Sequence, residues 1–180
     1  MRVIAGTLKG RRLKAPTWDG LRPTSDKLRE TLFNILASRV EGARVLDGYA
    51  GTGAVGIEAI SRGAAHVAFV EKHPRAAALI EGNLAVCGVE RGYTIERGDV
   101  ASVLRRLPAG AAFDLIFLDP PYDADAVTQA LDASAAVLAP DGLVVLERAT
   151  RRAPEIPASL TRVRDVKSGD STLTFMTRPR

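Results

Sequence analysis

The chain has 180 residues, of which 46% are hydrophobic and 26% are charged, and a formal net charge of +4 at pH 7. This length fits a single domain, and the absence of a membrane-length apolar stretch or an apolar signal segment predicts a cytoplasmic protein. The single cysteine excludes an internal disulfide framework, and two histidines without ligand partners at a metal-binding spacing predict no metal site.

The charge is unevenly distributed along the chain. Residues 1–39 carry nine Lys or Arg and three acids, residues 40–147 carry eight and fifteen, and residues 148–180 carry eight and three. One interpretation is that the charged ends only keep the protein in solution. The other is that the basic ends contact the phosphates of a polyanion around an acidic central body.

A short basic hairpin is predicted at the start of the chain. Glycines at positions 6 and 10 punctuate two extended pieces within residues 3–15, and their exposed positions are basic. The segment is too polar to be a core element. Its basic residues, called the basic hairpin residues below, are Lys9, Arg11, Arg12 and Lys14.

A helix is predicted over residues 26–39, where leucine and isoleucine recur at helical spacing. Thr24 or Ser25 supplies its N-cap, and the acidic residue at position 26 suits its first turn. Arg29 and Glu30 are expected on a solvated face of this helix.

Strand-like and helix-like segments alternate after residue 42. The predicted strands are 43–47, 67–71, 93–97, 113–118 and 143–147. The helices between them are 54–62, 75–86, 100–106 and 124–138. This alternation predicts βαβ units, and hence a parallel sheet with right-handed crossovers.

The last part of the chain departs from this alternation of strands and helices. Pro154 and Pro157 prevent a regular helix after the fifth strand. Residues 160–166 and 172–177 alternate as strands across a turn at 168–170, which predicts an antiparallel hairpin. The fold class is therefore α/β, with a doubly wound, mostly parallel, Rossmann-like sheet that ends in an antiparallel C-terminal hairpin.

A glycine-rich loop follows the first strand. From Asp47 to Gly56 the sequence reads Asp-Gly-Tyr-Ala-Gly-Thr-Gly-Ala-Val-Gly, and its glycines let the backbone turn sharply close to a ligand. The spacing satisfies Gly-x-Gly-x-x-Gly, a pattern that serves NAD, FAD or an adenosyl cofactor equally. Glu71 closes the second strand twenty residues after Gly51, where its carboxylate can accept hydrogen bonds from both ribose hydroxyls.

Four carboxylates are expected at the C-terminal ends of successive strands, namely Asp47, Glu71, Asp99 and Asp119. Asp47 would repel a pyrophosphate but attract a cationic sulfonium or ammonium group, and Asp99 could accept from an adenine amine. Each acid alone could equally be a strand-end or helix-cap residue. Together they favour a cationic adenosyl ligand.

Asp119, Pro120, Pro121 and Tyr122 end the predicted strand 113–118. In open α/β sheets ligands bind at that end of the strands, so a carboxylate, a carbonyl and an aromatic face are gathered there. Asp119 and the Pro120 carbonyl could hold the two N–H groups of an exocyclic amine while Tyr122 stacks on its ring. An Asp-Pro pair alone is common in turns, and the four residues together after a strand are a stronger signal.

The glycine loop from Asp47 to Gly53 and the motif from Asp119 to Tyr122 resemble those of Class I S-adenosylmethionine-dependent methyltransferases. Essentially the whole chain resembles the RsmD family. The more specific residues are Arg22-Pro23-Thr24, Asp26, Arg29-Glu30, Phe33-Asn34 and Gly169-Asp170-Ser171. Tyr49 and Thr52 stand where phenylalanine and serine are common, and both changes keep size and chemistry.

The resemblance implies a seven-stranded methyltransferase sheet, S-adenosylmethionine as methyl donor with S-adenosylhomocysteine as product, and methylation of the N2 amine of one guanine in 16S rRNA. The substrate would be an assembled or partly assembled small ribosomal subunit, whose shape supplies specificity that a short basic surface lacks. The base would be flipped out of its stack. Residues 1–40 would form a basic extension and residues 41–180 the methyltransferase domain of a monomer without an obligate protein partner.

The resemblance also assigns site residues, for a direct in-line transfer that needs no metal and in which positioning supplies most of the rate. The catalytic residues are Asp119, Pro120, Pro121 and Tyr122. The cofactor-binding residues are Asp47, Tyr49, Ala50, Gly51, Thr52, Gly53, Glu71, Lys72, Asp99, Val100 and Asp119. The RNA-binding residues are Lys9, Arg11, Arg12, Lys14, Arg22, Thr24 and Arg29.

Three alternatives stay open. The Asp-Pro-Pro-Tyr geometry would suit another amine, such as DNA adenine or a protein glutamine side chain. The glycine spacing alone would suit a nicotinamide-dependent oxidoreductase. The basic ends alone would suit a non-catalytic ribosome-assembly factor.

Overall fold

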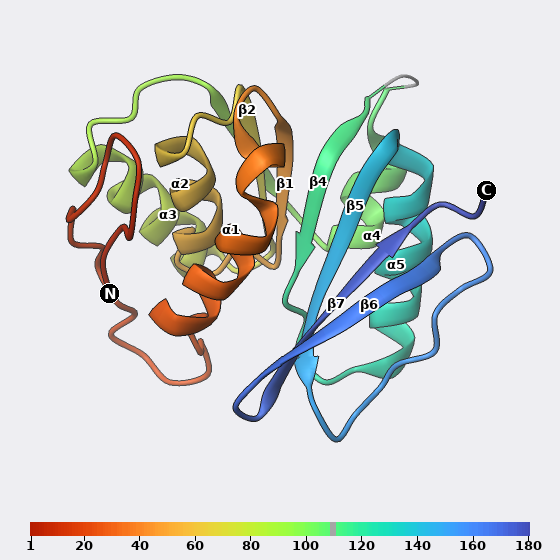
Figure 1. Cartoon of the computed structure of the whole chain (residues 1–180). Coiled ribbons are helices and arrows are strands. Elements are labelled where there is room, and N and C mark those ends of the chain that lie inside the picture. The colour runs from red at the N-terminus through yellow and green to blue at the C-terminus, as the bar shows by residue number, and fades with distance from the viewer. Residues whose placement is uncertain (109–110) are drawn as a thin grey trace.

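The computed structural model describes residues 1–108 and 111–180, in which helices cover both faces of one twisted sheet (Figure 1). The helices are α1 (Asp26–Val40), α2 (Ala54–Ser61), α3 (Pro74–Val86), α4 (Val100–Arg106) and α5 (Ala124–Val137). The strands are β1 (Arg44–Gly48), β2 (His66–Glu71), β3 (Tyr93–Arg97), β4 (Phe113–Leu118), β5 (Leu138–Ala149), β6 (Thr161–Ser168) and β7 (Ser171–Thr177). Across these described ranges, no helix combines the length and apolar character that crossing a membrane requires.

The strand order in the sheet is β3-β2-β1-β4-β5-β7-β6. Neighbouring strands from β3 to β5 are parallel, whereas β7 lies antiparallel between β5 and β6. This arrangement confirms the predicted α/β fold with a mostly parallel sheet of seven strands and an antiparallel C-terminal hairpin. The chain also passes from β5 to β6 without a helix in the described residues, as Pro154 and Pro157 predicted.

β5 begins earlier than the sequence predicted. Leu138 already pairs with Phe113, and the register then shifts before Leu143 pairs with Leu115. The sequence predicted the strand only from residue 143, because Pro140 and the residues after it interrupt the apolar pattern. In the structure the chain stays paired with β4 around this irregularity, as it does at a β-bulge.

Alternate residues of each strand face opposite layers, so the sheet separates two hydrophobic clusters. On one face, Val45 of β1 and Phe117 of β4 pack against α1, α2, α3 and the N-terminal segment. On the other face, Leu46 and Leu118 pack against α4 and α5. Each large apolar side chain buried in this way contributes about 1.5–3 kcal/mol to stability. These clusters fix the strands whose C-terminal ends carry the predicted site.

The start of α1 agrees with the sequence prediction. The Ser25 hydroxyl accepts a hydrogen bond from the backbone N–H of Leu28 at 3.2 Å, which makes Ser25 the N-cap. Asp26 in the first turn and Arg39 in the last turn complement the helix dipole. Because α1 is anchored in the core by buried residues such as Leu32, the segment before its N-cap is held beside the sheet.

The N-terminal segment is part of the core, so the prediction that it is too polar for this is wrong. Val3 and Leu13 are buried in the same cluster as the residues of α1. One bridge joins Arg2 and Arg12, and the Val3 N–H donates to the Arg11 carbonyl at 2.9 Å. Val3 and Leu13 point inward from among exposed basic residues, which conceal them in the sequence. Residues 1–40 therefore share one core with the rest, and their division from residues 41–180 stays a prediction.

Candidate active site

A pocket of about 540 Å³ opens at the C-terminal edge of the parallel strands, toward which β4 and β5 run at the bottom of Figure 1. Its wall contains most of the residues predicted for cofactor and catalysis, which are Asp47, Tyr49, Ala50, Gly51, Thr52, Glu71, Lys72, Asp99, Val100, Asp119, Pro120, Pro121 and Tyr122. Arg22 and Thr24 of the predicted RNA-binding set line it too. Gly53, Arg29 and the basic hairpin residues lie outside this wall.

The loop after β1 turns sharply into α2. Tyr49 and Gly51 both have φ of 59°, and Gly53 has φ of 77° as the N-cap of α2. A Cβ on Gly51 would come 3.1 Å from the Leu21 side chain, and one on Gly53 would come 3.2 Å from Ile80. Gly51 thus makes room for the Leu21 side chain, whereas Gly53 serves the turn and the packing against Ile80.

Asp47 is buried at the end of β1. Its Oδ2 accepts a hydrogen bond from the backbone N–H of Gly56 at 2.9 Å. Burial raises the pKa of Asp47 well above its ordinary value, and the charges of Asp119 and Glu71 raise it further, while the bond from Gly56 opposes them. A cationic group bound in this pocket would relieve that repulsion.

Glu71 at the end of β2 holds the glycine loop. Its Oε2 accepts from the backbone N–H of Gly51 and its Oε1 accepts from that of His73, both at 2.9 Å. A carboxylate oxygen can accept more than one hydrogen bond, so both oxygens retain capacity for ligand hydroxyls. Glu71 therefore orders the loop and presents acceptors to the pocket at the same time.

Asp99 and Tyr49 face the same part of the pocket. Asp99 is the N-cap of α4, where its Oδ2 accepts from both the backbone N–H and the hydroxyl of Ser102 at 3.1 Å. The Tyr49 hydroxyl is buried without a hydrogen-bond partner among the described residues. Burial, together with the charges of Asp99 and Asp123, raises the pKa of Tyr49 to about 12. A neutral phenol in this position is suited to a polar ligand group.

Asp119 follows β4 and lies beside a second acid, Glu147 of β5. Asp119 follows Leu118 and Glu147 follows Leu146, and these two leucines pair across β4 and β5. Burial raises the pKa of Asp119 to about 8, and the charge of Glu147 adds to this effect. Burial also raises the pKa of Glu147. The hydroxyl of Thr24 opposes the rise at both acids, as a donor that favours the charged form.

Tyr122 presents its ring to solvent, with 71% of its surface exposed. The guanidinium carbon of Arg152 lies 5.2 Å from the centroid of the ring. An exposed aromatic face at the rim of a pocket offers a stacking platform for a nucleobase. The next residue, Asp123, has a different task, because its Oδ1 accepts from the backbone N–H groups of Asp125 and Ala126 at the start of α5.

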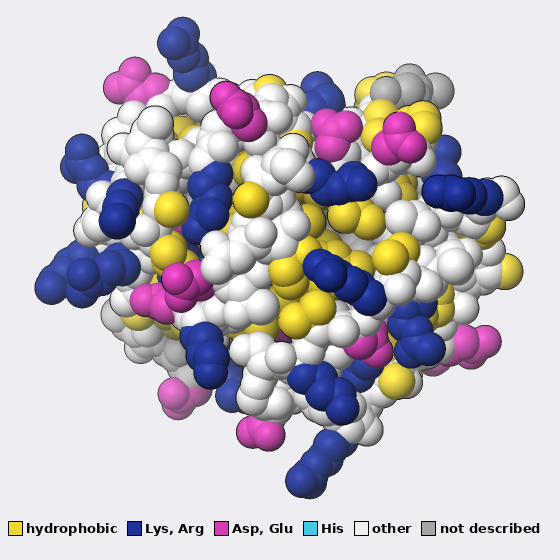
Figure 2. All heavy atoms as spheres, in the orientation of Figure 1, with side chains coloured by type: hydrophobic (Ala, Val, Ile, Leu, Met, Phe, Trp, Pro, Cys, Tyr) yellow, Lys and Arg dark blue, Asp and Glu magenta, His cyan; other side chains and the backbone are white. Residues whose placement is uncertain are grey.

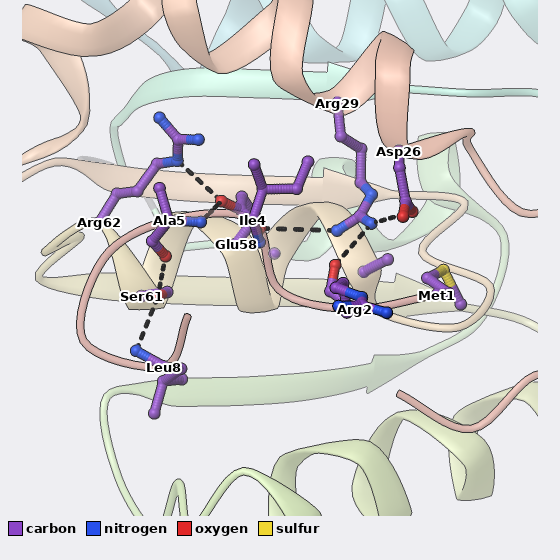
Figure 3. A network of polar contacts seen from close by, with 12 residues as sticks. Met1, Arg2, Ile4, Ala5, Leu8, Asp26, Arg29, Glu58, Ser61 and Arg62 are labelled. Carbon is purple, nitrogen blue, oxygen red and sulfur yellow. Dashed lines mark hydrogen bonds and ion pairs between the residues drawn. The ribbon is translucent and has the colours of Figure 1, made fainter. Parts of the chain in front are cut away.

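Arg29 is fully buried, so the prediction of a solvated face is wrong for this residue. Figure 3 shows its guanidinium among groups from three segments of the chain. Arg29 Nη2 donates to the Arg2 carbonyl at 2.9 Å and to Asp26 Oδ1 at 2.6 Å, and Nη1 lies 3.5 Å from Glu58 Oε2. A guanidinium held in the interior is not available to phosphate groups, which removes Arg29 from the surface that could contact RNA.

Glu58 of α2 is the acidic centre of this network, which Figure 3 shows from close by. It is fully buried, and its carboxylate accepts from the backbone N–H groups of Ile4 at 2.8 Å and Ala5 at 3.0 Å. Arg62 donates to the same carboxylate at 2.9 Å. Sequence reasoning missed this site, because Ile4 and Ala5 lie 54 and 53 residues from Glu58, Arg29 lies on another helix, and no motif joins these residues. Its function is to attach the N-terminal segment to α1 and α2.

The four basic hairpin residues are exposed, as predicted. Figure 2 shows Lys and Arg side chains spread over the face that Figure 1 presents, with hydrophobic side chains between them. On this face, basic charge by itself therefore does not outline one footprint. Arg22 and Thr24 are the predicted RNA-binding residues that the structure brings to the pocket.

A family model described as Conserved hypothetical protein 95 matches residues 1–177. Ribosomal RNA small subunit methyltransferase D of Escherichia coli K12 is 31% identical over 172 residues, which cover 94% of this chain and 85% of the relative. The protein of the same name from Haemophilus influenzae is 38% identical over 133 residues, or 73% of this chain and 68% of the relative. The chain belongs to the RsmD family.

Solved structures agree with membership of the RsmD family. The Escherichia coli protein yhhF, which carries an assignment as a methyltransferase, has a TM-score of 0.84 at 28% identity and covers 99% of this chain and 97% of its own. The hypothetical protein TTHA0928 of Thermus thermophilus has a TM-score of 0.83 at 32% identity, with 98% and 99% covered. The protein is therefore a methyltransferase, and neither the oxidoreductase nor the non-catalytic alternative describes it.

The RsmD relatives, as methyltransferases, imply S-adenosylmethionine as methyl donor, and the pocket residues fit this cofactor. The repulsion among Asp47, Glu71 and Asp119 favours a cation, and the buried Tyr49 hydroxyl can bond a polar group of the ligand. Within residues 1–108 and 111–180, no cluster of three or more His, Cys, Asp or Glu side chains is arranged to hold a metal ion.

Two residues of the site escaped the sequence analysis of this RsmD-family chain. Glu147 ends an apolar run just as Asp119 does, and this parallel is the signal that could have found it. Arg152 lies in an irregular segment, and its position over Tyr122 depends on tertiary structure alone.

Proposed function

We propose that this protein transfers a methyl group from S-adenosylmethionine to the exocyclic N2 amine of a specific guanine in 16S rRNA. The observation that carries the proposal is the position of Asp119, which lines the same pocket as the acids of β1 and β2 and follows strand β4 directly. The names of the Escherichia coli and Haemophilus influenzae relatives, small subunit methyltransferases, support rRNA as the substrate class.

The cofactor would be held by Asp47, the loop around Gly51, Glu71 and Asp99. When bound, S-adenosylmethionine supplies the methyl group on a positively charged sulfonium. Glu71 offers acceptors to the ribose hydroxyls while it keeps its bonds to the loop. Asp99 has one carboxylate oxygen outside the α4 cap bonds and presents it to the adenine amine. Lys72, Val100 and Thr52 complete the wall on this side.

The guanine would be held by the residues after β4. Asp119 and the Pro120 carbonyl accept from the two N–H groups of the amine, which directs the nitrogen lone pair away from both acceptors. Tyr122 stacks on the base, which must leave its own stack to reach the pocket. The amine becomes acidic only as it is alkylated, so a strong base is unnecessary and the Asp119 carboxylate receives the proton. Positioning supplies most of the rate.

The substrate would be an assembled or partly assembled small subunit in the cytoplasm, and the protein would act on it as a monomer. The exposed basic hairpin residues and Arg22 offer only a short basic surface. A folded ribonucleoprotein would supply the shape specificity that this surface lacks.

The test combines labelled S-adenosylmethionine with small subunits lacking the modification, naked rRNA, DNA and protein, followed by mapping of the labelled base. Asp119→Ala should still bind the cofactor within a few fold, and methyl transfer should fall at least ~100-fold, the scale for a positioned proton-handling group. Asp125→Ala is the matched control, because it removes an exposed acid nearby and should leave transfer unchanged. Labelling of DNA adenine or protein glutamine instead of rRNA, or parent-rate transfer by a folded Asp119→Ala protein, would overturn the proposal.

A further inference from the structure

Glu147 is an acid in the pocket that the mechanism above does not use. It lies in β5 directly after Leu146, whose partner Leu118 in β4 is followed by Asp119, and both acids line the same pocket. Neighbouring strands lie about 4.8 Å apart, so the two carboxyl groups can accept hydrogen bonds from adjacent atoms of one ligand. We propose that Glu147 accepts a hydrogen bond from N1–H of the guanine whose N2 amine Asp119 holds, and so determines base specificity.

The polar atoms of the nucleobases support this assignment, which rests on the proposed function. Guanine carries the N1–H donor directly beside its N2 amine, so its edge offers donors to both carboxylates. Adenine and cytosine each carry an acceptor nitrogen beside the amine, which would face the lone pairs of the second carboxylate. A single carboxylate can accept a hydrogen bond from any flat amine, whereas two adjacent carboxylates favour the base with two neighbouring donors.

Glu147 is held in place from both ends of the chain. Thr24 Oγ1 donates to Glu147 Oε2 at 3.2 Å, and Ser171 Oγ donates to Oε1 at 3.4 Å. Each oxygen thus has one donor and keeps capacity for a second. This anchoring fixes the carboxylate beside Asp119 before a base arrives, which is what a group that discriminates by hydrogen bonding requires.

The electrostatics of the pair agree with a ligand that brings donors. Burial raises the pKa of both acids, and the charge of Glu147 adds to the rise at Asp119, to about 8, while the charge of Arg22 lowers the pKa of both. Donors from guanine would favour the ionised forms of both acids and lower their pKa values. Base binding and proton release are then linked, so the apparent affinity for the substrate should increase as pH rises toward 8.

The experiment uses small subunits whose 16S rRNA carries either guanine or 2-aminopurine at the nucleotide identified by labelling. 2-Aminopurine keeps the amine but has an acceptor at N1. The parent protein should methylate guanine at least ~100-fold faster, because a site that hydrogen-bonds a substrate group rejects the analogue lacking it. In Glu147→Gln the amide can donate to N1 of 2-aminopurine. The ratio of the methylation rate on guanine to that on 2-aminopurine should therefore fall at least ~10-fold.

Thr24→Val is the control, since it loosens Glu147 without removing its charge. If Glu147 only anchors the segment before α1, both variants slow the two substrates equally and the preference stays unchanged, which would overturn the inference. Equal rates of the parent protein on both bases would overturn it too, even if Glu147→Gln failed to fold. Absence of guanine methylation by the parent protein would instead refute the proposed function, so the two failures are distinguishable.

Discussion

Replacement of Arg29 by methionine tests whether this residue is structural or contacts RNA. The sequence suggested RNA binding, but the structure buries the guanidinium between α1, α2 and the N-terminal segment. Arg29→Met keeps much of the side-chain volume and removes the charge. It leaves the Glu58 carboxylate, also fully buried, with Arg62 and two backbone N–H groups as its remaining partners.

The expected loss of stability follows from this environment. Removing one partner of a buried ion pair costs about 3–5 kcal/mol, because the other charge is left uncompensated. We expect the lower end of this range, about 3 kcal/mol, since Arg62 still lies 2.9 Å from Glu58. For a chain of this size each kcal/mol lowers the Tm by about 2–4 °C, so Arg29→Met should unfold roughly 6–12 °C lower.

Thermal and urea unfolding measure this loss of stability. RNA binding at several salt concentrations tests the alternative that Arg29 contacts RNA. The control is Arg162→Met, which removes an exposed arginine 3.5 Å from Asp165 and should change stability by no more than about 0.5 kcal/mol. The folded fraction of Arg29→Met should bind RNA with an unchanged salt dependence. A stability loss below about 1 kcal/mol, with a salt slope reduced by about one, would show that Arg29 contacts phosphate and refute the reasoning.

Three further predictions concern the pocket and the basic surface. Glu71→Ala loses charge-assisted hydrogen bonds worth on the order of 1.5–3 kcal/mol, so S-adenosylmethionine affinity should fall roughly 10- to 150-fold by calorimetry; unchanged affinity would make Glu71 purely structural. Alanine at all four basic hairpin residues should weaken subunit binding and lower its salt slope by about one for each phosphate that the variant no longer neutralises, while cofactor affinity stays constant. The pKa of Asp119 is raised to about 8 from its ordinary value of 3.8, so its contribution to stability is full below pH 3.8 and is lost as pH rises through 8. Asp119→Asn stays neutral, so it should raise the Tm over the parent protein more at pH 9 than at pH 5; a larger gain at pH 5 would contradict the assignment.

Much of the fold could be predicted from local patterns in the sequence. Apolar runs ended by acids, glycines or prolines located the parallel strands, and the end of each strand located Asp47, Glu71 and Asp119. Because parallel strands present the same ends to one edge, these residues meet in the pocket. Local pattern therefore sufficed wherever the site is built from strand ends in regular βαβ units.

The features that local patterns did not predict depend on which strands and segments become neighbours in the fold. Glu147 becomes a partner of Asp119 only through the β4–β5 register, and Arg29 is buried only because the N-terminal segment folds over α1. A helical pattern shows an arginine among polar neighbours in either case, so it cannot reveal an ion pair with Glu58. The RNA-binding surface and the division of the chain at residue 40 stay predictions for the same reason.

The position of β7 inside the sheet constrains when the protein can fold during its synthesis. β7 follows every other strand in the chain, yet β6 reaches the sheet only through β7. Until residue 177 has left the ribosome, β5 exposes an unpaired edge beside apolar residues such as Val144 and Leu146, and β6 has no strand to pair with. The nascent chain is thus most prone to aggregation just before β7 emerges, and a stop codon within β7 would leave this exposed edge permanently.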